Sequence, residues 1–369
     1  MKIGVPKEIK NQENRVGLVP ASVHELIAQG HEVWVETNAG LGIGISDTAY
    51  QAIGAHIAKN AQDIFANTQL IVKVKEPQPS ECAMLSRDHI LFTFLHLASD
   101  PLQTELLLKS NCVAIAYETI TDDNGALPLL KPMSDIAGRM SIQVGAHYLE
   151  EPQGGSGILL SHVADIAPAH ILIVGAGSAG LGALHVAACF GAHVTVIDKS
   201  LKRLEQLKQL FQNKIQTVES SPQAISEHIK NADLVIGAVL VPGAAAPRVI
   251  TREMLRSMHP RSVVVDIAID QGGCMETSKP TTHAHPIYIE ENIIHYCVTN
   301  MPGAVPRTSS FALNHATLPF VLALANKGLK NALLDDPHFL AGLNVFHGEV
   351  TYKAVAEALG YPLRADPLI

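Results

Sequence analysis

Three side chains that could bind and protonate a small substrate follow apolar, strand-like runs in the first third of the chain. Lys75 and His96 each come directly after such a run, and Arg15 lies in the polar loop after the first one. An arginine can hold a carboxylate through two parallel hydrogen bonds, and a lysine can donate to a carbonyl oxygen. A histidine titrates near neutrality and can carry a proton. Together these residues predict a site for a small carboxylate-bearing compound.

Each of these residues also has an ordinary structural interpretation. Lys75 could be a strand-end lysine in water, His96 a hydrogen-bonded core histidine, and Arg15 a loop arginine in a surface ion pair. Their coincidence at strand ends favours the site. Asp270 follows a later apolar run and would add a carboxylate that orients water or ammonia, or offsets an iminium charge. The alternative for Asp270 is a turn or helix-cap acid.

The most specific motif is a glycine-rich turn between an apolar run at 171–174 and an apolar helix-like segment. Its sequence fits G-x-G-x-x-G, with Gly175, Gly177 and Gly180 as the glycines and Ser178 and Ala179 between them. The first glycine permits a tight turn, the second lets a pyrophosphate approach the backbone, and the third lets the helix pack against the strand. Free N–H groups at the helix N-terminus then face the phosphates. The segment predicts a dinucleotide site.

A second strand-like run at 193–197 closes with Asp198, 23 residues after Gly175 (198 − 175). A carboxylate there can accept hydrogen bonds from the adenosine ribose and would repel a 2′-phosphate, which favours NAD over NADP. Lys199, Lys202 and Arg203 weaken this preference if they face the cofactor. The alternative is that they form the solvated first turn of the next helix.

Alternating strands and helices around these motifs predict an α/β fold of two doubly wound lobes, with a Rossmann domain inserted into a discontinuous substrate domain. We expect a substrate domain of residues 1–128 plus 307–369 and an NAD-binding domain of residues 129–306, with a cleft between them. A long helix at 134–150 should join the two. The expected strands are 3–5, 31–35, 70–74, 90–95, 112–117, 171–174, 193–197, 234–239, 262–269 and 294–299. The other expected helices are 20–29, 47–58, 102–109, 181–189, 201–211, 309–326 and a helical tail to residue 361.

Composition restricts the class of protein further. The chain has 369 residues, of which 47% are hydrophobic and 17% charged, which is typical of large buried elements in two domains. A net charge of −8 argues against a nucleic-acid or anionic-membrane partner. The first ten residues lack a signal-peptide core and no apolar stretch is long enough to span a membrane, so we expect a soluble, cytoplasmic protein. The five cysteines are widely spaced and predict reduced, buried thiols with no metal site.

Six strings resemble alanine dehydrogenase, and the similarity runs from residue 1 to about 360. They are Gly4-Val5-Pro6-Lys7-Glu8-Ile9 with Glu13-Asn14-Arg15-Val16; Val74-Lys75-Glu76-Pro77; Leu95-His96-Leu97-Ala98; Asp266-Ile267-Ala268-Ile269-Asp270-Gln271-Gly272-Gly273; and Asn300-Met301-Pro302-Gly303-Ala304-Val305-Pro306-Arg307-Thr308. The resemblance implies reversible, NAD-dependent oxidative deamination of L-alanine to pyruvate and ammonia by a homohexamer. It also implies that Arg15 and Lys75 bind the substrate and that His96 and Asp270 are the acid/base pair. The implied cofactor contacts are Ser134, Ser178, Asp198, Arg203, Ser220, Val239, Leu240, Ile267, Lys279 and Met301.

One segment departs from the family pattern. Ser161-His162-Val163-Ala164-Asp165-Ile166 stands where family members usually have a glycine-rich turn, so the resemblance leaves the local backbone path and subunit contacts open. Two rival interpretations also stay open. One is the NAD-binding subunit of a transhydrogenase, which shares the fold and parts of the first motif but would lack the full set of four chemical residues. The other is a catalytically silent, NAD-responsive binding protein.

Overall fold

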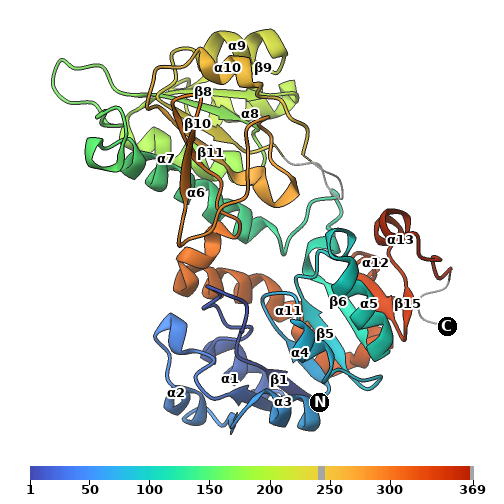
Figure 1. The fold of residues 1–369 in the computed structure, drawn as a ribbon. Coiled ribbons are helices and arrows are strands. Elements are labelled where there is room, and N and C mark those ends of the chain that lie inside the picture. The colour runs from blue at the N-terminus through green and yellow to red at the C-terminus, as the bar shows by residue number, and fades with distance from the viewer. Residues whose placement is uncertain (240–245, 366–369) are drawn as a thin grey trace. The chain divides into compact units, whose positions relative to one another are not determined.

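The computed structural model describes residues 1–239 and 246–365 and divides into two compact units. The first contains Met1–Pro132 and the chain from Val305 onward, and the second contains Met133–Ala304. Each unit is built around one twisted sheet flanked by helices (Figure 1). In the described part of the chain, no helix combines the length and apolar character needed to cross a membrane.

The sheet of the first unit has the strand order β15-β14-β6-β5-β4-β1-β2-β3. Its strands are β1 (Lys2–Val5), β2 (Glu32–Glu36), β3 (His56–Ala58), β4 (Leu70–Val72), β5 (Ile90–Thr93), β6 (Val113–Ala116), β14 (Leu343–Phe346) and β15 (Glu349–Val350). Strands β1 to β6 pair in parallel, and the late hairpin β14–β15 joins β6 antiparallel. Strands β4, β5 and β6 are buried throughout and apolar except for Thr93, as expected for parallel strands covered on both faces.

The helices of this unit alternate with the parallel strands along the chain, as expected for a doubly wound sheet. They are α1 (Pro20–Ala28), α2 (Asp47–Gln51), α3 (Ala61–Asn67), α4 (Pro79–Cys82), α5 (Pro101–Ser110), α11 (Pro306–Leu334), α12 (Pro337–Leu340) and α13 (Lys353–Leu359). Helix α11 is interrupted at Gly328, whose φ of 73° and ψ of 165° are not helical.

Two secondary-structure predictions for this unit are wrong. The helix expected at 47–58 ends at Gln51, because the chain turns at Gly54 with a φ of 95° and then pairs with β2 as strand β3. The tail expected to be helical contains the β14–β15 hairpin, whose two turn residues, His347 and Gly348, both have positive φ. Strand pairing therefore overrides the local helical pattern in both segments.

The second unit has a sheet with the order β12-β13-β11-β10-β7-β8-β9, parallel except for the β12–β13 hairpin. Its strands are β7 (His170–Val174), β8 (His193–Asp198), β9 (Gln216–Glu219), β10 (Leu234–Gly237), β11 (Val263–Asp266), β12 (Ile287–Glu290) and β13 (Ile293–Tyr296). Its helices are α6 (Lys131–Tyr148), α7 (Ser178–Phe190), α8 (Leu201–Leu210), α9 (Pro222–Ile229) and α10 (Arg252–Arg256). Without β12, the strands follow the Rossmann order 3-2-1-4-5-6, with the switch point between β7 and β10.

The parallel strands of the first unit follow the same order. Numbered along the chain, β3-β2-β1-β4-β5-β6 is again 3-2-1-4-5-6, so that switch point lies between β1 and β4. The fold class predicted from the sequence is confirmed: the protein has two doubly wound α/β sheets. One strand is shorter than predicted. The strand expected at 262–269 ends at Asp266, and residues 267–271 form a 3-10 helix.

The segment with the unusual sequence forms a tight turn. Val163 and Ile166 form an antiparallel bridge, the Ile166 N–H donates to the Val163 carbonyl at 2.8 Å, and Ala164 has a φ of 45°. The side chains of Ile158, Leu159, Val163 and Ile166 are all exposed, which gives this segment an apolar surface.

Candidate functional site

The glycine loop of the second unit has the geometry that a dinucleotide requires. Gly175 has a φ of 104°, and a Cβ there would lie 2.5 Å from the Ala238 carbonyl oxygen. A Cβ on Gly180 would lie 1.9 Å from the Gly175 oxygen, so helix α7 can pack this closely only without a side chain. Around Gly177 the space is open to 4 Å, and no side chain caps α7, which begins at Ser178. Backbone N–H groups there can meet a pyrophosphate.

Asp198 is joined to this loop by hydrogen bonds. Its Oδ2 accepts the Ala176 N–H at 2.7 Å, and its Oδ1 accepts the Ser200 N–H at 2.8 Å. The Nε of Arg203 donates to the Ala176 carbonyl at 2.9 Å, and the Ser220 N–H donates to the Asp198 carbonyl at 2.9 Å. The structure therefore brings Asp198, Arg203 and Ser220 together at one end of β8, around the glycine loop. Arg203 contacts the loop rather than remaining a solvated first-turn residue.

Asp270 lies on the 3-10 helix η5 (Ile267–Gln271), directly after β11. The side chain of Asp270 is exposed, and Ile267 begins the same helix. Asp266 fixes the start of this helix: its fully buried carboxylate accepts the N–H groups of Ala268 at 3.0 Å and Cys274 at 2.8 Å. Burial raises the pKa of Asp266, although hydrogen bonds from Ser278 and Cys274 oppose the shift.

The remaining cofactor residues predicted by resemblance are placed as follows. Val239 is half-buried just past β10, and Leu240 lies outside the described residues. Ser134 is half-buried near the start of α6, and Met301 is buried in a 3-10 turn. Lys279 pairs with Glu290, with 2.6 Å between Nζ and Oε2, so the structure holds this cation in a surface ion pair.

In the first unit, Arg15 is buried, with 2% of its surface exposed, rather than a surface residue. Its Nε donates to Oε1 of Glu13 at 2.7 Å, and a terminal nitrogen donates to the other carboxylate oxygen, Oε2. Glu13 also accepts the Arg15 backbone N–H at 3.0 Å. This pairing fixes the plane of the guanidinium.

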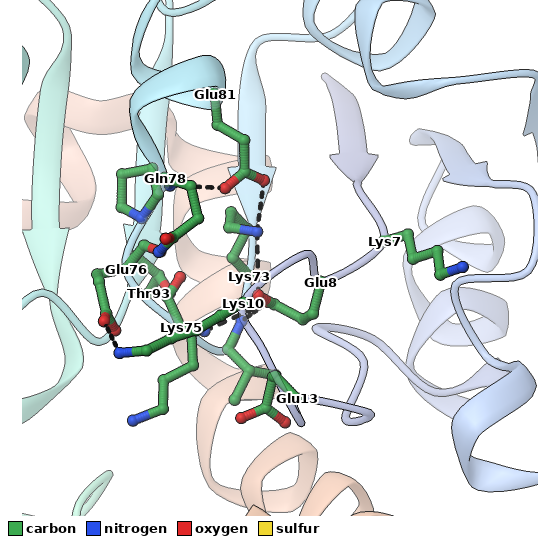
Figure 2. A network of polar contacts seen from close by, with 12 residues as sticks. Lys7, Glu8, Lys10, Glu13, Lys73, Lys75, Glu76, Gln78, Glu81 and Thr93 are labelled. Atoms are coloured by element: carbon green, nitrogen blue, oxygen red, sulfur yellow. Dashed lines mark hydrogen bonds and ion pairs between the residues drawn. The ribbon is translucent and has the colours of Figure 1, made fainter. Parts of the chain in front are cut away.

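Lys75 is half-buried at the end of the β4 segment, and its main chain is held on both sides. Its N–H donates to Oε1 of Glu8 at 3.3 Å, and its carbonyl accepts the Thr93 hydroxyl at 2.9 Å. Figure 2 shows the Lys75 side chain extending away from Glu81. The neighbouring Glu76 has a buried carboxylate oxygen without a hydrogen-bond partner among the described residues. Burial favours a higher pKa for Glu76, but Lys75 and Lys10 together lower it below the usual value.

His96 has a left-handed backbone, with φ of 54° and ψ of 37°. Non-glycine residues adopt this conformation at an energetic cost and often at functional sites. Its N–H donates to Glu118 Oε1 at 2.7 Å, and its ring is stacked on Phe94 with 5.9 Å between centroids. The His96 side chain is exposed, which contradicts the alternative of a hydrogen-bonded core histidine.

These residues of the first unit lie at adjacent strand ends. Strand β1 precedes the Arg15 loop, β4 precedes Lys75 and β5 precedes His96, and the sheet order places β1, β4 and β5 side by side. Arg15 and Lys75 therefore flank the switch point, where ligands of doubly wound sheets bind. Two carboxylates that hold the backbone at these ends, those of Glu8 and Glu118, were not singled out from the sequence. The same is true of Asp266, which holds the start of η5 in the second unit. The sequence signal that could have pointed to Glu8 and Asp266 is their place in the strings that resemble alanine dehydrogenase.

Comparisons with known proteins show which families and solved structures this chain is similar to. The family model "Alanine dehydrogenase/PNT, N-terminal domain" matches residues 4–137, and "Alanine dehydrogenase/PNT, C-terminal domain" matches residues 141–353. Alanine dehydrogenase of Halomonas elongata is 56% identical over 98% of this chain and 97% of its own length, and that of Methanococcus maripaludis is 50% identical over the same shares. A solved L-alanine dehydrogenase is 46% identical, with a TM-score of 0.94 over 98% of this chain and 99% of its own. The transhydrogenase from Sinorhizobium meliloti is 25% identical, with a TM-score of 0.81 over 96% of this chain and 100% of its own.

Two doubly wound sheets, one with a dinucleotide-type glycine loop and one with an arginine, a lysine and a histidine at its strand ends, define an α/β protein of the dehydrogenase type. The full-length matches make the assignment specific. The chain belongs to the alanine dehydrogenase/PNT family.

Proposed function

We propose that the protein catalyses the reversible, NAD-dependent oxidative deamination of L-alanine to pyruvate and ammonia. One observation carries the proposal: Arg15 and Lys75 flank the switch point of the first sheet, and His96 follows the adjacent strand. With Asp270, the chain has the complete set of four chemical residues expected of alanine dehydrogenase. The identity of about half or more to alanine dehydrogenases over nearly the whole chain supports the same activity.

The glycine loop and Asp198 fit NAD as the cofactor. Open space at Gly177 admits a pyrophosphate, and the negative charge of Asp198 disfavours the 2′-phosphate of NADP. When bound, NAD supplies the acceptor for the hydride that leaves the alanine Cα. The overall reaction is alanine, NAD and water giving pyruvate, ammonium, NADH and one proton.

The residues of the chain then have separate tasks. Arg15, with its plane fixed by Glu13, binds the substrate carboxylate, and Lys75 donates to the oxygen or nitrogen at the reacting carbon. His96 moves the proton, because histidine is the side chain that most often serves as a general acid or base. Asp270 orients the water that hydrolyses the imine, and in the reverse direction the ammonia.

We further propose that the protein is cytoplasmic and assembles into a homo-oligomer, a hexamer by family resemblance. The exposed apolar side chains of Ile158, Leu159, Val163 and Ile166 support association, because such a cluster is costly to leave in water. The second candidate is a transhydrogenase NAD-binding subunit, favoured only by the likeness to the Sinorhizobium meliloti protein.

A steady-state panel of amino acids with NAD, followed by the absorbance of NADH, tests the proposal. We expect turnover with L-alanine and oxidation of NADH by pyruvate only when ammonium is present. NAD binding without turnover of any amino acid would favour the silent binding protein or the transhydrogenase subunit.

A further inference from the structure

A buried network of three ionisable side chains lies beneath the strand ends of the first unit (Figure 2). The Nζ of Lys73 lies 3.1 Å from Oε2 of Glu8 and 2.7 Å from Oε1 of Glu81. The exposed fractions of the three side chains are 0% for Lys73, 2% for Glu8 and 1% for Glu81. The proposed chemistry uses none of these three residues.

Such a network adds little net stability to a fold, because its charges lose their hydration on burial. Burying ions removes their hydration, and apolar side chains of similar volume often stabilise a core as well or better. Here two carboxylates face one ammonium, and burial raises the pKa of Glu8 against the opposing effect of Lys73. Burial alone would lower the pKa of Lys73, but the two carboxylates raise it above its usual value. Lys73 therefore stays charged and can hold Glu8.

Glu8 differs from Glu81 in what its second oxygen contacts. Oε1 of Glu8 accepts the N–H groups of Val74 at 2.6 Å and Lys75 at 3.3 Å. Oε2 of Glu81 instead accepts the Gln78 N–H at 2.8 Å, at the start of α4. Glu8 is thus bonded to the peptide that precedes the substrate-binding lysine, whereas Glu81 completes a helix cap.

Glu8 also belongs to the loop that carries Arg15. This loop follows β1, and the carboxylate of Glu8 reaches the end of β4, so it bridges the switch point of the sheet. A second bridge joins the same two segments, because Lys10 pairs with Glu76. The relative position of Arg15 and Lys75 therefore depends on carboxylate contacts between two segments about 65 residues apart in sequence.

We propose that Glu8 is a positioning residue that sets the spacing between Arg15 and Lys75, so that both can bind one substrate molecule. The inference rests on the proposed function, in which these two cations bind the carboxylate and the reacting centre. Lys73 pairs with Glu8 from below. Glu81 shares the same ammonium but is bonded to the start of α4, not to the backbone of Lys75. Glu8 contacts neither substrate nor cofactor in this account and acts through the backbone of Lys75.

The test compares Glu8→Gln with the matched control Glu81→Gln in the full-length protein. Both variants remove one carboxylate charge from the same buried network, so both should lower the melting temperature. We expect Glu8→Gln to raise the KM for L-alanine and pyruvate by about tenfold or more, because displacing a substrate-binding group by a fraction of an ångström is costly. Its KM for NAD should stay within about twofold of the parent, as should every KM of Glu81→Gln.

Glu8→Asp keeps the charge but shortens the side chain by one methylene. It replaces Glu8→Gln in the KM comparison if Glu8→Gln does not fold. It should raise the KM for alanine by at least about threefold while leaving that for NAD unchanged. Equal substrate KM values for the Glu8 and Glu81 variants, in an active parent, would overturn the positioning role alone. A parent that does not turn over alanine would instead contradict the proposed function.

Discussion

Replacing Asp198 by serine should change cofactor choice through two separate effects. The first is a loss of hydrogen bonds, because the carboxylate accepts the N–H groups of Ala176 and Ser200 at 2.7 and 2.8 Å. Hydrogen bonds to a charged group contribute about 1.5–3 kcal/mol each. A serine hydroxyl can keep one of these contacts, so the loop loses about one such bond together with a contact to the ribose. We therefore expect NAD binding to weaken by roughly 1–3 kcal/mol.

The second effect is electrostatic. Two unit charges 4 Å apart repel each other by about 1 kcal/mol in water and about 4 kcal/mol near a protein surface. Removing the Asp198 charge relieves this repulsion of a 2′-phosphate, so NADP should bind more tightly while NAD binds more weakly. The NAD-to-NADP ratio of kcat/KM should then fall by at least about tenfold, since each 1.4 kcal/mol is a factor of ten.

Glu219 provides a matched control for this substitution. It pairs in register with Asp198 across β8 and β9 and is exposed, so Glu219→Ser removes a nearby charge without changing the glycine loop. Initial rates with saturating alanine and varied NAD or NADP give the NAD-to-NADP ratio of kcat/KM for each of the two variants. An unchanged ratio in Asp198→Ser, or the same change in Glu219→Ser, would refute the assignment of Asp198 as the selectivity residue.

Three further predictions concern the substrate, the proton and stability. Arg15→Lys should lower kcat/KM for alanine and pyruvate by a factor that corresponds to about 1.5–3 kcal/mol, because lysine cannot make the two parallel hydrogen bonds. The affinity for NAD should stay unchanged. Pyruvate bound as tightly as in the parent would show that Arg15 does not bind substrate. His96→Gln should lower kcat by about 10²-fold or more, remove one limb of the pH–rate profile and leave NAD binding intact. Asp270→Asn should have a comparable effect, and the double variant should be far from additive; near-parent kcat and an unchanged profile in His96→Gln would place the proton carrier elsewhere. Burial lowers the pKa of His295, whose ring bonds Thr277 and the Ile293 carbonyl, so its stability contribution is complete above about pH 6.5 and is lost as the unfolded chain takes up a proton below that pH. Melting temperatures between about pH 7.5 and pH 5.5 should therefore fall less in His295→Gln than in the parent, and parallel curves would contradict this linkage.

The glycine loop and the strand-end residues could be predicted from the sequence because their signals are local. A turn with Gly175, Gly177 and Gly180 between two apolar segments needs no information from distant residues. Lys75 and His96 were placed at strand ends by the apolar runs that precede them. Parallel strands then bring their carboxyl ends to one edge of the sheet.

The contacts that hold these residues could not be predicted, because they depend on strand order. Glu8 meets Lys73 only because β1 and β4 are neighbours, although 65 residues separate them in sequence. Nothing local distinguishes Glu8 from a surface glutamate in a polar loop. The hairpin turn at His347 and Gly348 was missed for a similar reason, since pairing with β6 rather than local propensity makes that segment a strand.

The most direct test of the account is the equilibrium of the reaction itself at several pH values. Purified protein with L-alanine and NAD should form pyruvate, ammonium and NADH in equal amounts. Since one proton is released, the ratio of products to substrates at equilibrium should rise about tenfold per pH unit, or about 1.4 kcal/mol. NADH formed without pyruvate, or no NADH formed from alanine at any pH, would contradict the proposed oxidative deamination.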